Sequence, residues 1–139
     1  MSAIENKEKV KRLYDALNQG NYAILDEMFS TEVQDHASHG TAKGLDEFKQ
    51  FSAVAGMAFP DMQMQVDDIV AEGNMVAARG RLTGTNTGPW MGQPPTNKPI
   101  NISWMTIYRF EAGKIVERWL NGDDLAMMQQ LGLAPSPAA

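Results

Sequence analysis

A series of strand patterns in the second half of the chain constrains its fold more than any other feature. These patterns cover residues 62–71, 75–85, 100–110 and 114–120. The pairs Gly73-Asn74 and Ala112-Gly113 are turn sequences, so the strands that they join are expected to run antiparallel. Gly80 and Gly84 lie inside the second strand, where glycine indicates bends or bulges. The second half therefore predicts a strongly bent antiparallel sheet.

The first half carries helix patterns, and one more helix pattern follows the strands. Helices are expected between Ser2 and Gly20, over residues 23–29 and 45–59, and from Leu125 to Leu131. Ser2 and Glu5 have the spacing of a capping box, which fixes the start of the first helix. Pro60 ends the third helix, because proline disfavours helical geometry in the residue before it.

Helices that are segregated from an antiparallel sheet predict an α+β domain. Residues 33–36 are expected to form a brief strand, and residues 37–41, which include His39, a polar loop. A bent sheet wrapped on N-terminal helices leaves a conical hollow, so a cone-shaped barrel is expected. Residues 1–133 are predicted to form this single domain, and residues 134–139 a flexible tail.

The composition argues against several classes of function. The chain has 139 residues, a net charge of −5 and no basic run, so nucleic-acid binding is not expected. It has no cysteine, and its two histidines lack a third strong ligand nearby, so no metal site is expected. No apolar run approaches the roughly 20 residues that span a bilayer, and no signal peptide is evident. A cytoplasmic protein without membrane contact is therefore predicted.

Several short sequences along the chain together resemble one family. They are Val33-Gln34-Asp35-His36, Phe59-Pro60-Asp61-Met62, Gly84-Thr85-Asn86-Thr87-Gly88, Gly92-Gln93-Pro94-Pro95-Thr96-Asn97-Lys98-Pro99, the run from Tyr108 to Trp119, and Gln129-Gln130-Leu131-Gly132. In order and spacing, residues 5–133 resemble the SnoaL-like polyketide cyclases, a branch of the NTF2-like (ketosteroid-isomerase-like) superfamily. The resemblance implies a cone-shaped α+β barrel, a homodimer packed through its sheets, and no cofactor. It also implies intramolecular aldol-type ring closure of a polyketide ester.

Asp123 is the first catalytic candidate. A strand pattern ends at Trp119, and Asp123 and Asp124 follow where an indole and the end of the sheet should meet. A carboxylate beside apolar surface is poorly solvated, which raises its pKa from about 3.9 toward neutrality and makes it a usable general base. The resemblance places the family's catalytic acid at Asp123, four residues after Trp119. A structural role is the alternative, because Asp is also a favoured helix N-cap.

His36 is the second catalytic candidate, and the resemblance aligns it with the family's pocket histidine. A neutral imidazole would donate a hydrogen bond to an enolate oxygen or return a proton to it. The alternative is an ordinary histidine at a strand edge. The expected substrate is a small, largely apolar carbonyl compound. The predicted substrate-binding residues are large apolar side chains with two polar neighbours: Trp104, Trp119, Phe51, Phe59, Thr106 and Tyr14.

Three alternatives to the cyclase stay open. A ketosteroid-isomerase-like proton shuttle would use Asp35 or His36 as its base and Tyr14 as the donor to an oxyanion. An epoxide hydrolase would need an Asp-Arg-Asp cluster around a water, and Thr106, which stands where an acid would help, argues against it. The third alternative is a non-catalytic small-molecule-binding dimer of the same fold.

Overall fold

The computed structural model describes residues 2–38 and 40–136 and shows an α+β fold. Its helices are α1 (Ala3–Asn18), α2 (Ile24–Met28), α3 (Leu45–Ala58) and α4 (Asp124–Gln130). Its strands are β1 (Phe29–Ala37), β2 (Gly40–Lys43), β3 (Gln63–Glu72), β4 (Met75–Thr85), β5 (Pro99–Glu111) and β6 (Lys114–Gly122). His39 of the predicted loop and residues 137–139 of the predicted tail lie outside the described residues.

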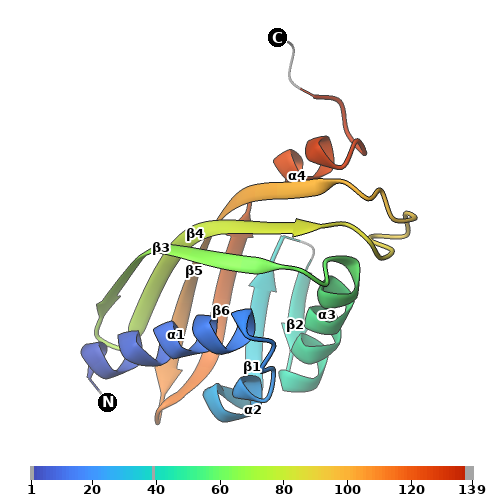
Figure 1. Ribbon diagram of the computed structural model, residues 1–139. Coiled ribbons are helices and arrows are strands. Elements are labelled where there is room, and N and C mark those ends of the chain that lie inside the picture. Colours follow the sequence, from blue (N-terminus) through green and yellow to red (C-terminus); the bar gives the residue numbers. More distant parts are fainter. Residues whose placement is uncertain (1, 39, 137–139) are drawn as a thin grey trace.

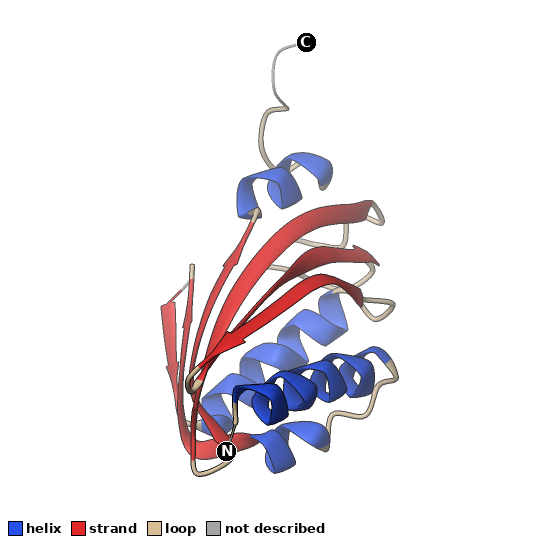
Figure 2. Ribbon diagram, turned by 90° about the vertical axis from the view of Figure 1, so that its left-hand side faces the viewer, coloured by secondary structure: helices blue, strands red, loops and turns tan. Residues whose placement is uncertain are grey.

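The strands form one six-stranded sheet in the order β2-β1-β6-β5-β4-β3. Neighbouring strands are antiparallel except β1 and β6, which are parallel. The sheet curves around α1, α2 and α3, which lie on its concave side (Figures 1 and 2). It does not close into a complete barrel within the described residues, because β2 and β3 are its two edges. The predicted α+β class and the bent sheet wrapped on N-terminal helices are confirmed.

Local sequence signals account for most element boundaries. The Ser2 hydroxyl accepts a hydrogen bond from the Glu5 backbone N–H at 3.1 Å, as the capping-box spacing predicts. The turn between β3 and β4 has Gly73 at φ +58°, a conformation that glycine adopts without steric cost. Along β5 every second residue is buried, from Ile100 to Phe110, so one face of this strand meets the core.

The prediction of a polar loop over residues 37–41 was wrong for Ala37, which ends β1, and for Gly40 and Thr41, which belong to β2. Strand β2 pairs antiparallel with β1 through main-chain hydrogen bonds, with His36 opposite Thr41. Strand β1 is also longer than the predicted residues 33–36, because it pairs with the distant strand β6. Pairing between backbones leaves no side-chain pattern in a polar segment, so β2 and the two ends of β1 were not visible in the sequence.

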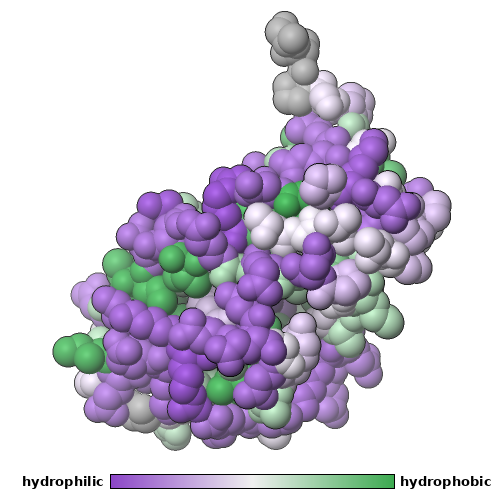
Figure 3. All heavy atoms as spheres, in the orientation of Figure 1, coloured by the Kyte–Doolittle hydropathy of each residue, from purple (hydrophilic) through white to green (hydrophobic). Residues whose placement is uncertain are grey.

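The core lies between the concave face of the sheet and the helices. One buried cluster joins α1, α2 and α3 to the sheet, and a second joins α4 to the end of α3 and to β5. On the face shown in Figure 3, hydrophilic residues predominate and the hydrophobic ones form separate small patches. None of the helices in the described part of the chain has the length and apolar character needed to cross a membrane.

Candidate active site

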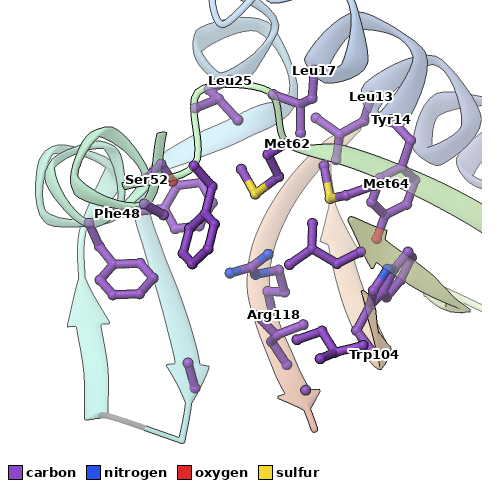
Figure 4. Close-up of a pocket in the computed structure, with 18 of the residues that line it drawn as sticks. Leu13, Tyr14, Leu17, Leu25, Phe48, Ser52, Met62, Met64, Trp104 and Arg118 are labelled. Carbon is purple, nitrogen blue, oxygen red and sulfur yellow. The ribbon is translucent and has the colours of Figure 1, made fainter. Parts of the chain in front are cut away.

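A largely apolar cavity of about 220 Å³ lies between the concave face of the sheet and the helices (Figure 4). Its volume is just below the roughly 300–1,000 Å³ of sites for drug-sized ligands, so it suits a small substrate. Side chains from all four helices and from five strands line it, among them Leu13, Tyr14, Leu17, Leu25, Phe48, Phe51, Ser52, Phe59, Met62, Met64, Leu82, Trp90, Trp104, Tyr108, Arg118, Asp124 and Met127.

Tyr14, Trp104 and Tyr108 define what we call the inner end of the cavity. The two tyrosines share a hydrogen bond there. The hydroxyl oxygens of Tyr14 and Tyr108 are 2.6 Å apart. Burial raises the pKa of Tyr14 well above 10, and the neighbouring Tyr108 raises it further. Burial also raises the pKa of Tyr108, although the charge of Arg118 acts in the opposite direction. Both hydroxyls therefore keep their protons at neutral pH.

Arg118 places a positive charge in the cavity and is held there by Asp35. The guanidinium donates from Nε and Nη2 to the two carboxylate oxygens of Asp35, at 2.5 Å and 3.0 Å. The guanidinium carbon also lies 4.8 Å from the ring centre of Phe48, a cation–π distance. Burial alone would lower the pKa of Arg118, but the hydrogen bonds and charge of Asp35 raise it, so Arg118 stays charged.

Trp104 brings an indole to the same inner end. Its ring centre is 5.2 Å from that of Tyr14, and its side chain is only 5% exposed. The indole nitrogen has no hydrogen-bond partner among the described residues. In Figure 4 the Trp104 nitrogen and the Tyr14 hydroxyl lie next to each other in the view.

Two adjacent acids follow β6, and the structure gives them different surroundings. Asp124 is exposed and lines the cavity, where the Ser38 hydroxyl donates a hydrogen bond to its carboxylate. Asp123 is the N-cap of α4, and its carboxylate accepts a hydrogen bond from the Ala126 N–H at 3.1 Å. Asp123 does not line the cavity. Its role as a base stays a prediction, and the helix cap that was its structural alternative is present.

His36 lies on the outer face of the sheet and does not line the cavity. Its Nε2 is 2.6 Å from the Glu117 carboxylate, its Nδ1 is 3.2 Å from the Thr41 hydroxyl, and its ring stacks on Trp119 at 5.5 Å. The Glu117 carboxylate also accepts hydrogen bonds from Arg109. The hydrogen bond with His36 is the main cause that lowers the pKa of Glu117. The catalytic role of His36 stays a prediction.

The structure divides the predicted substrate-binding residues between the two faces of the sheet. Tyr14, Phe51, Phe59 and Trp104 all line the cavity. Trp119 does not, since its side chain lies on the outer face and is 36% exposed. Thr106 is buried, but its hydroxyl donates to the Trp119 carbonyl oxygen at 2.9 Å and does not line the cavity either.

A bulge in β6 explains why the sequence pointed to Trp119 and missed Arg118. Ile115 is buried on the concave side and pairs with Phe110, but the next pair is Glu117 with Arg109, so Val116 is an extra residue. Side chains alternate in a strand, so one extra residue moves all later ones to the opposite face. Regular alternation from Ile115 would place Trp119 inward. The sequence signal available for Tyr108 was that Ile102, Trp104 and Phe110 stand an even number of positions from it, on the same face of the predicted strand.

The described residues offer no group suited to a metal ion. Within residues 2–38 and 40–136, no three side chains of His, Cys, Asp or Glu converge in a way that could hold one. The polar groups of the side chains that line the cavity are instead hydroxyls, two indole N–H groups, an amide, a guanidinium and a carboxylate. Such a set can donate hydrogen bonds to a negative oxygen and accept a proton.

Comparison with known proteins agrees with this architecture. The family model described as SnoaL-like polyketide cyclase matches residues 8–131. A candidate SnoaL-like polyketide cyclase from Jannaschia sp. CCS1 is 26% identical, with a TM-score of 0.88 over 96% of this chain and 95% of that chain. The candidate polyketide cyclase IdmH from Streptomyces antibioticus is 30% identical, with a TM-score of 0.78 over 90% and 96% of the two chains.

The fold also occurs in a protein described with another activity. AclR, a candidate hydroxylase from Streptomyces galilaeus, is 27% identical, with a TM-score of 0.86 over 99% of this chain and 87% of that chain. No curated protein matches the chain in sequence. Because the family model covers most of the chain, this protein belongs to the SnoaL-like polyketide cyclase family.

Proposed function

We propose that this protein is a cofactor-independent cyclase that closes a ring in a small polyketide or related carbonyl substrate. The observation that carries the proposal is one apolar cavity with protonated hydroxyls and a fixed positive charge inside it and a carboxylate lining it. Burial in apolar surroundings strengthens such polar contacts to a developing charge. Membership of the SnoaL-like polyketide cyclase family supports the same reaction class.

The proposed reaction is an intramolecular aldol addition. A carboxylate removes a proton from a carbon between two carbonyl groups, and the electron pair stays on the substrate as an enolate. That carbon attacks a second carbonyl of the same molecule, which forms a carbon–carbon bond. The attacked oxygen then takes up the proton and becomes a hydroxyl. Protons between two carbonyls are acidic enough for a carboxylate to remove.

The proposed proton acceptor comes from the pair Asp123 and Asp124. The geometry favours Asp124, because this carboxylate lines the cavity. Asp123 occupies the position that the family resemblance identifies, and it caps α4 in this structure. His36 is retained as a candidate that returns a proton, although its partners Glu117 and Thr41 lie on the outer face.

Exchange of carbon-bound protons tests this proposal without knowledge of the natural substrate. The protein is incubated in D₂O with a β-keto ester, and loss of the proton signal between its carbonyls is followed by NMR. The wild-type protein is expected to accelerate exchange, and Asp124→Asn to lose about 10²–10⁴-fold of that acceleration. The exchange rates of Asp123→Asn and His36→Gln show whether either of the other two candidate residues takes part in the proton transfer.

Asp46→Asn is the matched control, since Asp46 is an exposed acid in the first turn of α3. It should exchange protons at the wild-type rate. If the wild-type protein exchanges protons no faster than buffer alone does, the cyclase proposal is contradicted and a non-catalytic binding protein is favoured. Loss of activity in Asp123→Asn alone would assign the acceptor to the family position.

We also propose that the protein is a homodimer packed through the outer face of the sheet. A row of paired residues crosses this face from Val70 through Ala77 and Ile107 to Trp119. Val70, Ile107 and Trp119 are 64%, 41% and 36% exposed, and Met105 beside them is 62% exposed. Light scattering of the purified protein tests this, with Met105→Glu expected to favour the monomer.

A further inference from the structure

Trp104 carries a buried hydrogen-bond donor that the described protein does not satisfy. The side chain is 5% exposed, and Nε1 has no acceptor within residues 2–38 and 40–136. An N–H left unpaired in a protein interior costs about 1–3 kcal/mol, so such donors are uncommon and call for an explanation. A bound ligand that brings its own acceptor would supply the missing partner.

The position of the indole fits this explanation. Trp104 lines the cavity, and its ring packs beside the ring of Tyr14 at a tilt of 32°. Figure 4 shows the indole nitrogen and the Tyr14 hydroxyl close together in the view, at the same end of the cavity. Two hydrogen-bonding groups from different elements, β5 and α1, therefore meet at one place in an apolar space.

The hydrogen-bond network around Tyr14 leaves its own proton available. The positive charge of Arg118 lowers the pKa of the Tyr108 hydroxyl against the effect of burial, and it favours the orientation in which the Tyr108 proton points away from the guanidinium. Either hydroxyl can donate across the 2.6 Å that separates the two oxygens, and in this orientation Tyr108 donates to Tyr14. This arrangement frees the Tyr14 O–H to donate to a ligand, and Asp35 holds Arg118 at the far end of the chain of hydrogen bonds.

We propose that the Trp104 indole N–H and the Tyr14 O–H together bind one substrate oxygen, the one that becomes negative when the enolate forms. The inference rests on the proposed cyclase function and adds the site that stabilises its intermediate. Two donors aimed at a developing negative oxygen in a dry site lower the barrier for its formation. The substrate therefore enters with a carbonyl or enol oxygen leading, and its apolar remainder contacts Met62, Met64 and Leu82.

A second tryptophan shows that an unpaired indole alone does not make this site. Trp90 also lines the cavity, and its buried Nε1 finds no partner in the part of the chain that the structure describes. Its ring neighbours are Phe51 at 6.4 Å and Phe59 at 5.7 Å, which carry no hydrogen-bonding group. The pairing of an indole N–H with a tyrosine hydroxyl distinguishes Trp104.

The test uses two ligands. The first is 4-nitrophenol, whose ionised form imitates an enolate and absorbs visible light. The second is nitrobenzene, which has the same ring and nitro group but lacks the phenol oxygen. Dye binding is measured by absorbance at a pH where the free dye is about half ionised. The wild-type protein is expected to bind the phenolate and to raise its ionised fraction. Trp104→Phe and Tyr14→Phe should each weaken phenolate binding about tenfold, because a hydrogen bond to a charged oxygen is lost.

Nitrobenzene binding should change little in either variant, since both keep an aromatic ring. Trp119→Phe, on the outer face, is the matched control and should bind the dye as the wild type does. The chain has three tryptophans, so its NMR spectrum has three side-chain indole N–H signals to follow. The Trp104 signal of the wild-type protein should move downfield with phenolate more than those of Trp90 and Trp119. This measurement needs no variant to fold.

Equal phenolate binding by wild type, Trp104→Phe and Tyr14→Phe would overturn the inference, as would an unmoved Trp104 signal when the dye binds. Neither readout requires turnover. Phenolate binding through Trp104 without catalysed proton exchange would leave this site in place and reject the proposed function. If Trp104→Phe and Tyr14→Phe do not slow the catalysed exchange, the proposed function stands and this oxygen-binding site is rejected.

Discussion

The carboxylate of Asp35 accepts two hydrogen bonds from Arg118, which is its register partner on the neighbouring parallel strand. Asp35 lies on β1 and is 2% exposed, and Arg118 lies on β6 with its side chain 14% exposed. The ion pair therefore joins β1 to β6 and presents a charged guanidinium to the cavity. The same contact thus links two strands of the sheet and fixes the position of a charge that lines the cavity.

We expect Asp35→Asn to lower the free energy of unfolding by about 3–5 kcal/mol. The substitution keeps the shape of the side chain but leaves Arg118 buried without its counter-charge, which is strongly destabilising. Urea unfolding measures the change. The control is Asp68→Asn, which breaks the exposed pair of Asp68 with Arg79 and should cost less than about 1 kcal/mol. Equal losses in the two variants would contradict the importance of burial.

Gly80→Ala is expected to destabilise the protein by about 3 kcal/mol or more. A Cβ at this position would lie 1.8 Å from the Gln65 carbonyl oxygen and 3.0 Å from the Trp104 ring, so the backbone of β3 must move. Gly56→Ala is the contrasting variant, because nothing lies within 4 Å of its added Cβ in α3. Alanine is the better helix former by about 1 kcal/mol. Thermal unfolding should show Tm falling for the first and rising for the second.

Asp123→Ala should lower the free energy of unfolding by about 1 kcal/mol, whereas Asp123→Asn should change it little. The Asp123 carboxylate caps α4 by accepting from the Ala126 N–H, and asparagine caps equally well. Urea midpoints of the two variants separate this structural role from catalysis. If Asp123→Asn keeps its stability but loses proton exchange, the residue acts in the reaction as well as at the helix end.

The lowered pKa of Glu117 predicts that the folded protein loses stability in acid. Its hydrogen bond with His36 is the largest cause that lowers its pKa below 4.5 in the folded protein. A carboxylate with a depressed folded pKa contributes stability above the unfolded value, and that contribution disappears as the pH falls through the folded value. We therefore expect the unfolding free energy of the wild type to drop below about pH 4.5.

Glu117→Gln should be less stable than the wild type at neutral pH and should lose less on acidification. Urea unfolding at several pH values between about 3 and 7 measures both slopes. Glu8→Gln is the control, since Glu8 forms an exposed pair with Lys11 and such pairs contribute little. Parallel curves for the wild type and Glu117→Gln would show that this carboxylate has no part in acid sensitivity.

The sequence alone determined the elements whose signals are local. The capping box of Ser2 and Glu5 fixed the start of α1, Gly73 fixed a turn, and the strand pattern over residues 100–110 predicted β5. Helices followed by antiparallel strands then gave the α+β class. Large aromatic side chains such as Trp104 were predicted to contact substrate, and Trp104 does line the cavity. These properties depend on residues near one another in the chain.

Only the tertiary structure decided which polar groups meet in the cavity. The extra residue Val116 turns Arg118 inward and Trp119 outward, and the main-chain register that creates this bulge leaves no mark in the side-chain pattern. The parallel pairing of β1 with β6 brings Asp35 to Arg118 across 83 positions of sequence. The site depends on backbone hydrogen bonds between distant strands, and every residue type except proline can both donate and accept those bonds.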